Sequence, residues 1–174
     1  MDHLAGKQML AEGSALPRSA EESARHWLAE GCRCERCEDW DGAIAAYRQA
    51  LAADPQDPPV RYFTHNNLGY SLLQVGCFDE AEGFCEIAIS INPEQYNAHK
   101  NLGLARAGQG RWLDAALSLA EAARLCPENT RAWLHLQQIL SSRPGLLEQS
   151  AELARLVCNV KGSYMKAGQP LKPH

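Results

Sequence analysis

Small and large apolar residues recur at a fixed spacing along the middle of the chain, with polar positions between them. Five sets of three residues show the same two spacings, 38 and then 34 positions. The sets are Gly31, Gly69 and Gly103; Trp40, Phe78 and Trp112; Ala43, Ala81 and Ala115; Ala50, Ala88 and Ala122; and Pro55, Pro93 and Pro127. Five independent columns with one period indicate an internal repeat, and a period of about 34 residues is typical of a repeated pair of helices.

Each repeat predicts two helices that pass close to each other. Gly and Ala mark the crossing, because a larger side chain there would push the helices apart. Pro follows the second helix, which it cannot continue. A single helix pair cannot bury its apolar face, so neighbouring pairs must stack into one continuous core. The pattern therefore predicts an all-α fold, a curved α-α superhelix with a concave inner wall.

These columns resemble the tetratricopeptide repeat (TPR), a helix–turn–helix unit of about 34 residues with Trp, Leu-Gly, Tyr, Ala, Phe and Pro at set offsets. The resemblance covers residues 24–129 as three repeats, with a weaker fourth unit after them. It implies a right-handed helical solenoid of the tetratricopeptide type. The chain departs from the family pattern at four positions, which are Glu30, His65, His99 and Arg106.

The repeat boundaries divide the chain into segments. We expect a partly helical leader over residues 1–23, repeats over 24–57, 58–95 and 96–129, a degenerate capping repeat over 130–162 and a flexible tail over 163–174. The leader is expected to hold a short helix around residues 4–12. The capping repeat keeps Trp133 in phase but has Gln137 where the earlier repeats have Gly, as expected for a terminal unit with one face in water.

The first two repeats lie four residues further apart than the second and third, and the additional residues fall near Pro58 and Pro59. Pro is well tolerated in the first turn of a helix, and four residues make about one helical turn. We therefore expect the first helix of repeat two to be longer by one turn, with its facing preserved. A looped insertion is the alternative.

Composition and charge narrow the class of protein. Ala and Leu are abundant whereas Val, Ile and Thr are few, which argues against a β or α/β fold. The net charge of −4 offers no field that would attract nucleic acid or an anionic membrane. No stretch approaches about 18 consecutive apolar residues, so no membrane span is expected. The odd number of cysteines, seven, fits reduced thiols, and we therefore expect a cytoplasmic protein.

In the tetratricopeptide family, the first helices of the repeats line a concave groove where partners bind. Asn67 and Asn101 directly precede the Leu-Gly pairs, 34 residues apart, at a column that faces this groove in the family. An amide offers both a donor and an acceptor, so two stacked asparagines can hold the backbone of an extended peptide. This arrangement resembles the asparagine ladder of long tetratricopeptide arrays. A solvated polar residue or a helix-start preference is the alternative explanation.

The family geometry adds further residues to the same wall. Repeat two contributes Asn66, Tyr70 and Gln74, repeat three contributes Asn97 and Lys100, and the capping repeat contributes Arg131, His135 and Gln138. Phe63 joins them either as a groove residue or as a cover for the core. Aromatic and amide groups with two cations suit a polypeptide partner with an acidic end.

The sequence therefore predicts a non-enzymatic protein–protein interaction module without a cofactor, which binds an extended peptide or a partner helix. A dedicated chaperone or assembly factor for a client protein is the alternative. The acidic C-terminal tail of chaperones is not supported as a partner, because only Asn67 matches the family's carboxylate clamp. The clamp positions hold Leu28, Cys32, Asn67, Asn97 and Asn101. The chain has no phosphate-binding loop, nucleophile elbow or zinc-protease His pair.

Three close cysteines, Cys32, Cys34 and Cys37, raise a third hypothesis, a metal or redox sensor. Helical geometry argues against a metal site, because Cys32 and Cys34 point to opposite sides of a helix at about 100° per residue. Cys77 is the one other cysteine expected nearby, and Cys34 occupies a core column where a small thiol packs well. We therefore expect no metal and leave a redox role open.

Overall fold

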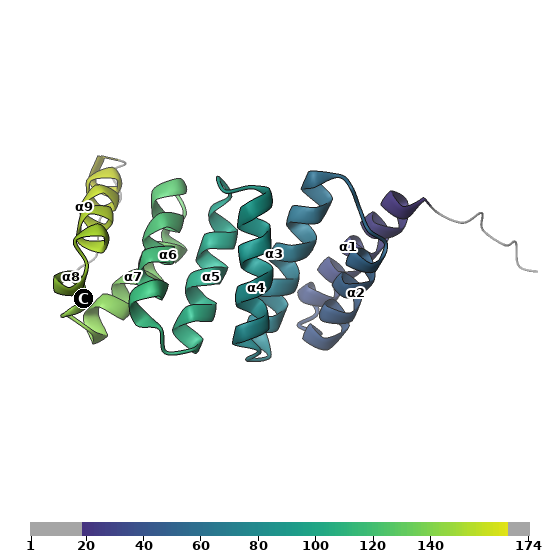
Figure 1. The fold of residues 1–174 in the computed structure, drawn as a ribbon, viewed down its shortest axis with the longest axis horizontal. Coiled ribbons are helices and arrows are strands. Elements are labelled where there is room, and N and C mark those ends of the chain that lie inside the picture. The colour runs from purple at the N-terminus through teal and green to yellow at the C-terminus, as the bar shows by residue number, and fades with distance from the viewer. Residues whose placement is uncertain (1–18, 167–174) are drawn as a thin grey trace, which may run out of the picture.

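The computed structural model describes residues 19–166, and within them the chain forms only helices and connecting turns. The helices are α1 (Ala20–Arg36), α2 (Trp40–Ala52), α3 (Pro58–Gln74), α4 (Phe78–Ile91), α5 (Tyr96–Gly108), α6 (Trp112–Leu125), α7 (Thr130–Ser142), α8 (Leu146–Gln149) and α9 (Ala151–Lys166). They follow one another along a single axis, from α1 and α2 at one end to α8 and α9 at the other (Figure 1). The predicted all-α solenoid is confirmed. Within residues 19–166, none of the helices is long and apolar enough to cross a bilayer.

Local capping signals set the start of the first two helices. The Glu22 N–H donates to Ser19 Oγ at 3.1 Å and the Ser19 N–H donates to Glu22 Oε2 at 3.1 Å, which makes a capping box for α1. The Gly42 N–H donates to Asp39 Oδ1 at 3.0 Å at the start of α2. Because of the capping box, α1 begins at Ala20, one turn ahead of the first expected repeat at residue 24.

The third helix is longer than its counterparts in the next two units. α3 has 17 residues, whereas α5 and α7 have 13 each. The four residues that lengthen the spacing, 58–61, form the first turn of α3 and not a loop. Proline fits this turn because the N–H that it lacks would have no partner within the helix.

The glycine column marks the close crossing of the two helices in each repeat. A Cβ atom at Gly31 would overlap the ring of Tyr47, which is fully buried. A Cβ at Gly103 would lie 2.6 Å from Cγ of Leu119, and in repeat two the same atom would lie 2.8 Å from a buried cysteine sulfur. These distances are too short for any side chain, which confirms the interpretation of this column.

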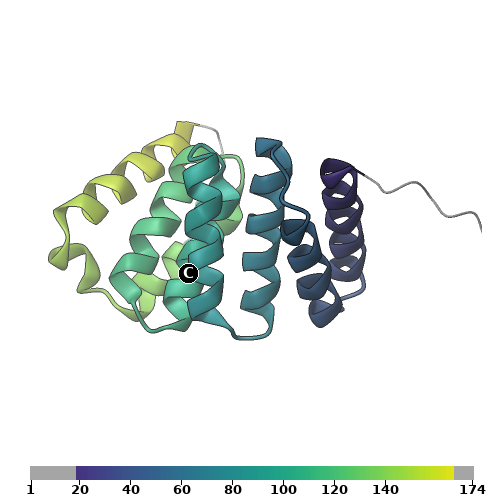
Figure 2. The ribbon, with the colours of Figure 1, turned by 45° about the vertical axis from the view of Figure 1, so that its right-hand side comes forward.

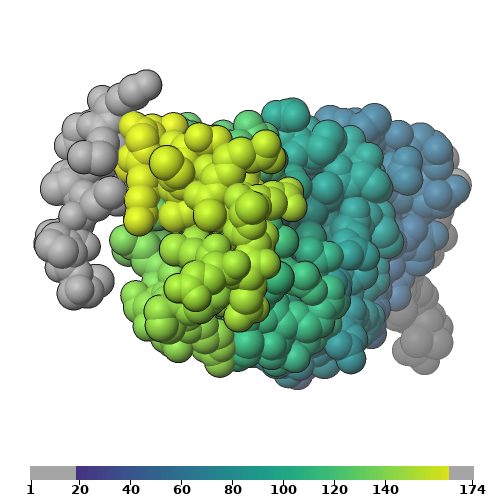
Figure 3. All heavy atoms as spheres, turned by 60° about the vertical axis from the view of Figure 1, so that its left-hand side comes forward, coloured from purple at the N-terminus to yellow at the C-terminus, as the bar shows by residue number. Residues whose placement is uncertain are grey.

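The terminal unit packs differently from the three repeats. Both α7 and α9 pack on α6, and their backbones make little contact with each other, as expected where Gln137 stands in place of glycine. Their aromatic rings meet instead, with Trp133 and Tyr164 stacked at 5.5 Å between ring centroids and both almost fully buried. As a result α9 lies obliquely beside the preceding helices (Figure 2) and covers the C-terminal end of the stack (Figure 3).

The prediction of a flexible tail from residue 163 is wrong at its start. Helix α9 continues to Lys166, because Tyr164 fills the core beside Trp133 and its hydroxyl donates to the carbonyl of Asn129 at 3.2 Å. The rest of the expected tail, residues 167–174, and the helix expected around residues 4–12 lie outside the described residues.

Candidate functional site

The predicted site residues lie on the first helices of successive units, and α3 contacts both α1 and α5. On α3 are Asn66, Asn67, Tyr70 and Gln74; on α5 are Asn97, Lys100 and Asn101; on α7 are Arg131, His135 and Gln138. Hydrogen bonds and charge interactions divide most of these side chains into two groups. One is a chain of amides that runs from α5 through α3 to α1, and the other is a cationic group shared by α5 and α7.

The amide side chains are hydrogen-bonded to one another across three helices. Asn101 Nδ2 donates to Asn66 Oδ1 at 3.2 Å, and Asn66 Nδ2 donates to Asn67 Oδ1 at 3.0 Å. Asn67 Nδ2 lies 3.5 Å from both Sγ of Cys32 and the hydroxyl of Tyr47. The asparagines predicted to form a ladder are therefore linked through a third asparagine, Asn66.

The burial of these amides differs from the sequence expectation. Asn101 is 2% exposed and Asn66 is 8% exposed, whereas Asn67 is half-buried. Asn101 Oδ1 is buried and has no hydrogen-bond partner among the described residues. Because its Nδ2 bonds Asn66, Asn101 is turned into the wall and does not present its amide to the groove. The period of 34 residues places Asn67 and Asn101 in one column, but the offset between α3 and α5 decides which of them is covered.

The polar chain ends at α1 in a half-buried carboxyl group. Ser71 Oγ, which is fully buried, donates to Glu35 Oε1 at 3.1 Å. Burial raises the pKa of Glu35, and the neighbouring hydroxyls of Tyr47 and Ser71 act in the opposite direction. Burial also raises the pKa of Tyr47. The polar groups between α1 and α3 are thus mostly bonded to one another.

Three groups that can carry positive charge gather between α5 and α7. Lys100 Nζ lies 5.9 Å from the centre of the Tyr70 ring and donates to Asn97 Oδ1 at 3.5 Å. Burial lowers the pKa of Lys100, and the nearby charge of Arg131 lowers it further. Burial also lowers the pKa of His135, and the charge of Lys100 adds to this effect. The Lys100 charge is therefore close enough to Arg131 and to His135 to interact unfavourably with each of them.

These inner cations lack carboxylate partners. Neither Lys100 nor Arg131 forms an ion pair with any carboxylate within residues 19–166. By contrast, Arg124 on α6 pairs with Glu121 at 2.7 Å. Lys100 therefore lies beside an aromatic ring and an amide without a described counter-charge. Gln74 on α3 and Gln138 on α7 are both exposed.

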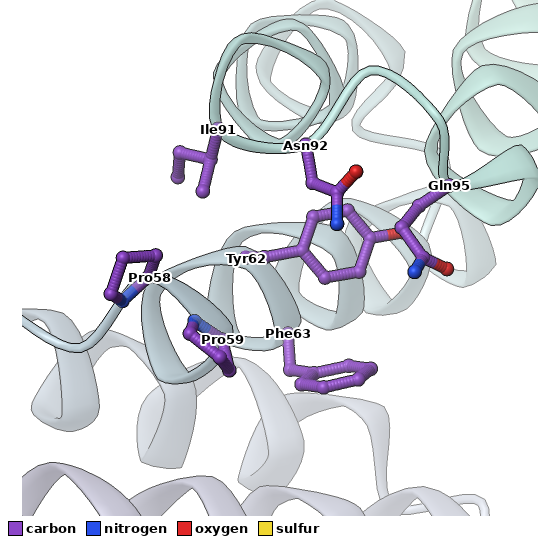
Figure 4. Close-up of a pocket in the computed structure, with 7 residues that line it drawn as sticks. All are labelled: Pro58, Pro59, Tyr62, Phe63, Ile91, Asn92 and Gln95. Carbon is purple, nitrogen blue, oxygen red and sulfur yellow. The ribbon is translucent and has the colours of Figure 1, made fainter.

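A cavity of about 180 Å³ lies at the start of α3. It is lined by Pro58, Pro59, Tyr62 and Phe63 of α3 and by Ile91, Asn92 and Gln95 at the end of α4 and in the turn before α5 (Figure 4). Phe63 is 49% exposed and Tyr62 is 3% exposed, and their rings meet edge to face with centroids 5.2 Å apart. Burial raises the pKa of the Tyr62 hydroxyl to about 12, and the backbone of Ala98 acts in the opposite direction.

The three close cysteines point in different directions. Cys34 is buried in the core, Cys32 is half-buried beside the amide chain, and Cys37 is exposed. All seven cysteines are free thiols, and across residues 19–166 no three metal-ligating side chains gather in one place.

The helical pairs, the glycine crossings and the repeat period agree with a known family. A sequence profile of the tetratricopeptide repeat matches residues 28–96 and 66–130, which together make up more than half of the chain. The chain belongs to the tetratricopeptide repeat family. Tetratricopeptide repeat domains are typically non-catalytic scaffolds.

Several solved tetratricopeptide structures share this fold. UNC-45 from C. elegans, in complex with an Hsp90 peptide, has a TM-score of 0.68 and 24% identity over 76% of this chain and 15% of its own. The Arabidopsis OM64 domain has a TM-score of 0.65 and 22% identity over 71% of this chain and 98% of its own. The first tetratricopeptide domain of Spaghetti (RPAP3), bound to an HSP90 peptide, has a TM-score of 0.63 and 23% identity, covering 70% and 94%.

Curated tetratricopeptide-containing relatives match over similar lengths. The protein O-mannosyl-transferase Tmtc2 of Drosophila melanogaster is 31% identical over 99 residues, which are 56% of this chain and 11% of the relative. The human protein O-mannosyl-transferase TMTC1 is 27% identical over 126 residues, covering 64% and 14%. The small glutamine-rich tetratricopeptide repeat-containing protein 2 of Mycosarcoma maydis is 29% identical over 106 residues, covering 61% and 29%. The chain therefore spans less than a third of the length of each of these relatives.

The tetratricopeptide pattern missed two features of the inner face. The cavity depends on Ile91, Asn92 and Gln95, which lie between repeats and carry no repeat signal. Its other wall comes from the additional turn of α3, and the irregular spacing of 38 residues was the available signal. Leu134, which is 52% exposed on α7, was also missed. An apolar residue in the column that holds Lys100 one repeat earlier could have drawn attention to it.

Proposed function

We propose that this chain is a protein–protein interaction module whose inner face binds an extended peptide that carries acidic residues. The observation that carries the proposal is the pair of cations without carboxylate partners, Lys100 and Arg131, on neighbouring first helices. Lys100 is half-buried, whereas Arg131 is exposed. A half-buried cation costs free energy unless a counter-charge arrives, and a ligand carboxylate supplies one. In this proposal the module is cytoplasmic, has no catalytic role and needs no cofactor.

The proposed site assigns different roles to the predicted residues. Lys100 and Arg131 bind ligand carboxylates, and His135 adds to their field when it is protonated. Tyr70 offers an aromatic face beside Lys100. The amides of Gln74, Asn97 and Gln138 are placed to bond the ligand backbone. Asn66, Asn67 and Asn101 are positioning residues, because their hydrogen bonds tie α5 to α3 and α1.

The solved neighbours support a peptide as the class of partner. Two of them are complexes with Hsp90 peptides, and another is a complex of the TPR2B domain of yeast Sti1 with an Hsp70 peptide. A peptide ligand with acidic residues agrees with this, but the clamp positions of this chain hold Leu28, Cys32, Asn97 and Asn101, which are not cations. In this proposal a chaperone tail is therefore not the natural ligand. The alternative to a peptide-binding module is an assembly factor dedicated to one client protein.

Fluorescence anisotropy with two labelled ten-residue peptides tests the proposal. One peptide ends in four acidic residues, and the other has the corresponding amides. We expect the acidic peptide to bind at least tenfold more tightly, which is about 1.4 kcal/mol, and to lose most of that advantage in Lys100→Ala and Arg131→Ala. Arg124→Ala, which removes a cation already paired with Glu121, is the matched control and should leave affinity unchanged.

Equal binding of the two peptides, or no effect of either inner-face variant, would overturn the proposal. Gel filtration distinguishes the alternative. A one-to-one complex with a folded client that persists through the column, without measurable affinity for the acidic peptide, would favour an assembly factor.

A further inference from the structure

We infer that the cavity at the start of α3 receives one large apolar side chain of the peptide that the inner face binds. This inference rests on the proposed function and deepens it, because the cavity would select among acidic peptides. Its volume of about 180 Å³ is comparable with an apolar cavity of about 150 Å³ that holds a benzene molecule. The cavity is therefore large enough for one aromatic or branched aliphatic side chain.

The side of the cavity formed by Pro58, Pro59 and Phe63 favours an apolar occupant. Pro58 and Pro59 lack backbone N–H groups, so they present ring carbons without a competing donor. The Phe63 ring is 49% exposed, although it belongs to a large apolar side chain, and it lies over the buried ring of Tyr62. Covering the Phe63 ring removes apolar surface from water, which is favourable in proportion to the area buried.

The rim of the cavity carries amides that suit a peptide backbone. Asn92 Oδ1 accepts from the Glu94 N–H at 3.3 Å, which leaves the two hydrogens of its Nδ2 for a ligand carbonyl. Gln95 is the N-cap residue of α5, but its side chain makes no capping hydrogen bond. Figure 4 shows both amides beside the Tyr62 ring, across the cavity from Pro58 and Pro59.

Helix α3 carries residues of both the cavity and the proposed binding surface. Pro59, Phe63, Asn66 and Tyr70 follow one another at spacings of three or four residues, so they lie along one side of the helix. Tyr70 contacts Lys100. An extended peptide whose carboxylates lie at Lys100 and Arg131 can therefore continue along this side of α3 toward Phe63.

The additional turn explains why the cavity lies at this repeat. Pro58 and Pro59 belong to the four residues that lengthen α3, and the helices α5 and α7 lack this turn. The departure from the repeat period thus provides one wall of the cavity. A feature that breaks the repeat is suited to selecting a ligand, because the stacking columns alone do not distinguish one partner from another.

The occupant that fits both features is a peptide with one Leu or Phe at a fixed distance from its acidic residues. A series of twelve-residue labelled peptides tests this. Each peptide ends in four acidic residues, and a single Leu is moved one position at a time through an otherwise Ser-Gly sequence. We expect one position to raise affinity at least tenfold over the peptide without Leu, which is about 1.4 kcal/mol.

Variants of the wall locate the effect. Phe63→Ser should abolish the gain in affinity that Leu provides. Its affinity for the Leu-free peptide should stay within twofold of the affinity of the original chain. Ile87→Ser is the matched control, since Ile87 is 41% exposed on α4, outside the proposed binding surface, and it should keep the gain. If Phe63→Ser does not fold, Pro59→Gln places an uncharged polar side chain in the same wall at an exposed residue and should have the same effect.

The outcomes separate this inference from the proposed function. If no Leu position raises affinity while the Leu-free acidic peptide still binds, the cavity is not a ligand site and the proposed function stands. A gain that persists in both wall variants also overturns the inference. If none of the acidic peptides binds, the proposed function and this inference both fail.

Discussion

The two halves of the inner face use similar polar residues in opposite ways. Between α1 and α3, polar side chains are partners of one another, as with Asn67 and the hydroxyl of Tyr47 at 3.5 Å, and the carboxyl of Glu35 accepts a hydrogen bond from a buried serine. Between α5 and α7, the charge of Arg131 adds to the electrostatic cost of the Lys100 charge, and neither cation forms an ion pair with a carboxylate within residues 19–166.

This difference shows how one repeat column can serve two purposes. A polar residue becomes part of the wall where the adjacent helix supplies its partner, and the resulting network adds to stability. The same column remains available to a ligand where the adjacent helix supplies a like charge. Substitutions should therefore change stability in the first half and peptide affinity in the second.

The largest expected effect comes from Tyr47→Ala in the first half. Tyr47 is fully buried and its ring fills the space that Gly31 leaves open. Removing a buried aromatic ring leaves a cavity and costs about 3–5 kcal/mol. Urea denaturation followed by circular dichroism measures this loss of unfolding free energy.

A second tyrosine provides the matched control. Tyr70 is half-buried beside Lys100 in the proposed site. Tyr70→Ala should therefore lower the free energy of unfolding by less than about 1.5 kcal/mol. The same variant should lower the affinity for the acidic peptide several-fold. If Tyr70→Ala loses as much stability as Tyr47→Ala, then the second half of the inner face also serves mainly to stabilise the fold, and the distinction between the two halves is wrong.

The double variant Asn67→Ala with Asn101→Ala should produce the next largest effect. It breaks every hydrogen bond of the amide chain and leaves Asn66 buried without a partner, at a cost of about 2 kcal/mol in unfolding free energy. The affinity for the acidic peptide should stay within threefold. Gln74→Ala, at an exposed amide of the same helix, should leave stability unchanged.

The contrary result would restore the ladder interpretation. The double variant could have the same free energy of unfolding as the original chain but bind the acidic peptide at least tenfold more weakly. Asn67 and Asn101 would then contact the ligand backbone, and the distinction between a stabilising half and a ligand-binding half would be wrong. Both quantities can be measured on the same preparation.

The residue columns predicted the stacking better than the site. Gly31 and Gly103 could be placed at helix crossings from the sequence, because close packing there restricts the size of the side chain at that single position. The burial of Asn101 could not be predicted, because it depends on the offset between α3 and α5. The cavity could not be predicted either, since Ile91 and Gln95 reach it only through the turn between repeats. For Tyr164, the contact with an earlier helix extends α9 beyond the last repeat signal.

A smaller effect of opposite sign is expected for Lys100→Met. Burial and Arg131 lower the pKa of Lys100, so the folded chain binds this proton less tightly than the unfolded chain does. The charge therefore reduces stability at neutral pH, and this cost disappears as the pH rises above the ordinary lysine value of about 10.4. Lys100→Met should gain about 0.5 kcal/mol at pH 7 and bind the acidic peptide about tenfold more weakly. Lower stability together with unchanged binding would place Lys100 in the wall.

The smallest effect, and the sharpest contrast with Lys100, is expected for Glu35→Gln. Burial raises the pKa of Glu35, so its carboxyl contributes full stability below the ordinary value of about 4.3 and loses it as the pH rises through the folded-state pKa. Gln removes the charge and keeps an acceptor for Ser71 Oγ. The variant should therefore be about 0.5 kcal/mol more stable at pH 7 and equal to the original chain near pH 4.

Glu35 and Lys100 are both charges made unfavourable by burial, one in each half of the inner face. Because Glu35 lies in the half whose polar groups bond one another, Glu35→Gln should leave peptide affinity unchanged, whereas Lys100→Met should not. Thermal unfolding at pH 4 and pH 7, with anisotropy at pH 7, measures both predictions. A tenfold change in affinity for Glu35→Gln would mean that the carboxyl repels the ligand. The binding surface would then extend across α1, and the two halves would act as one site.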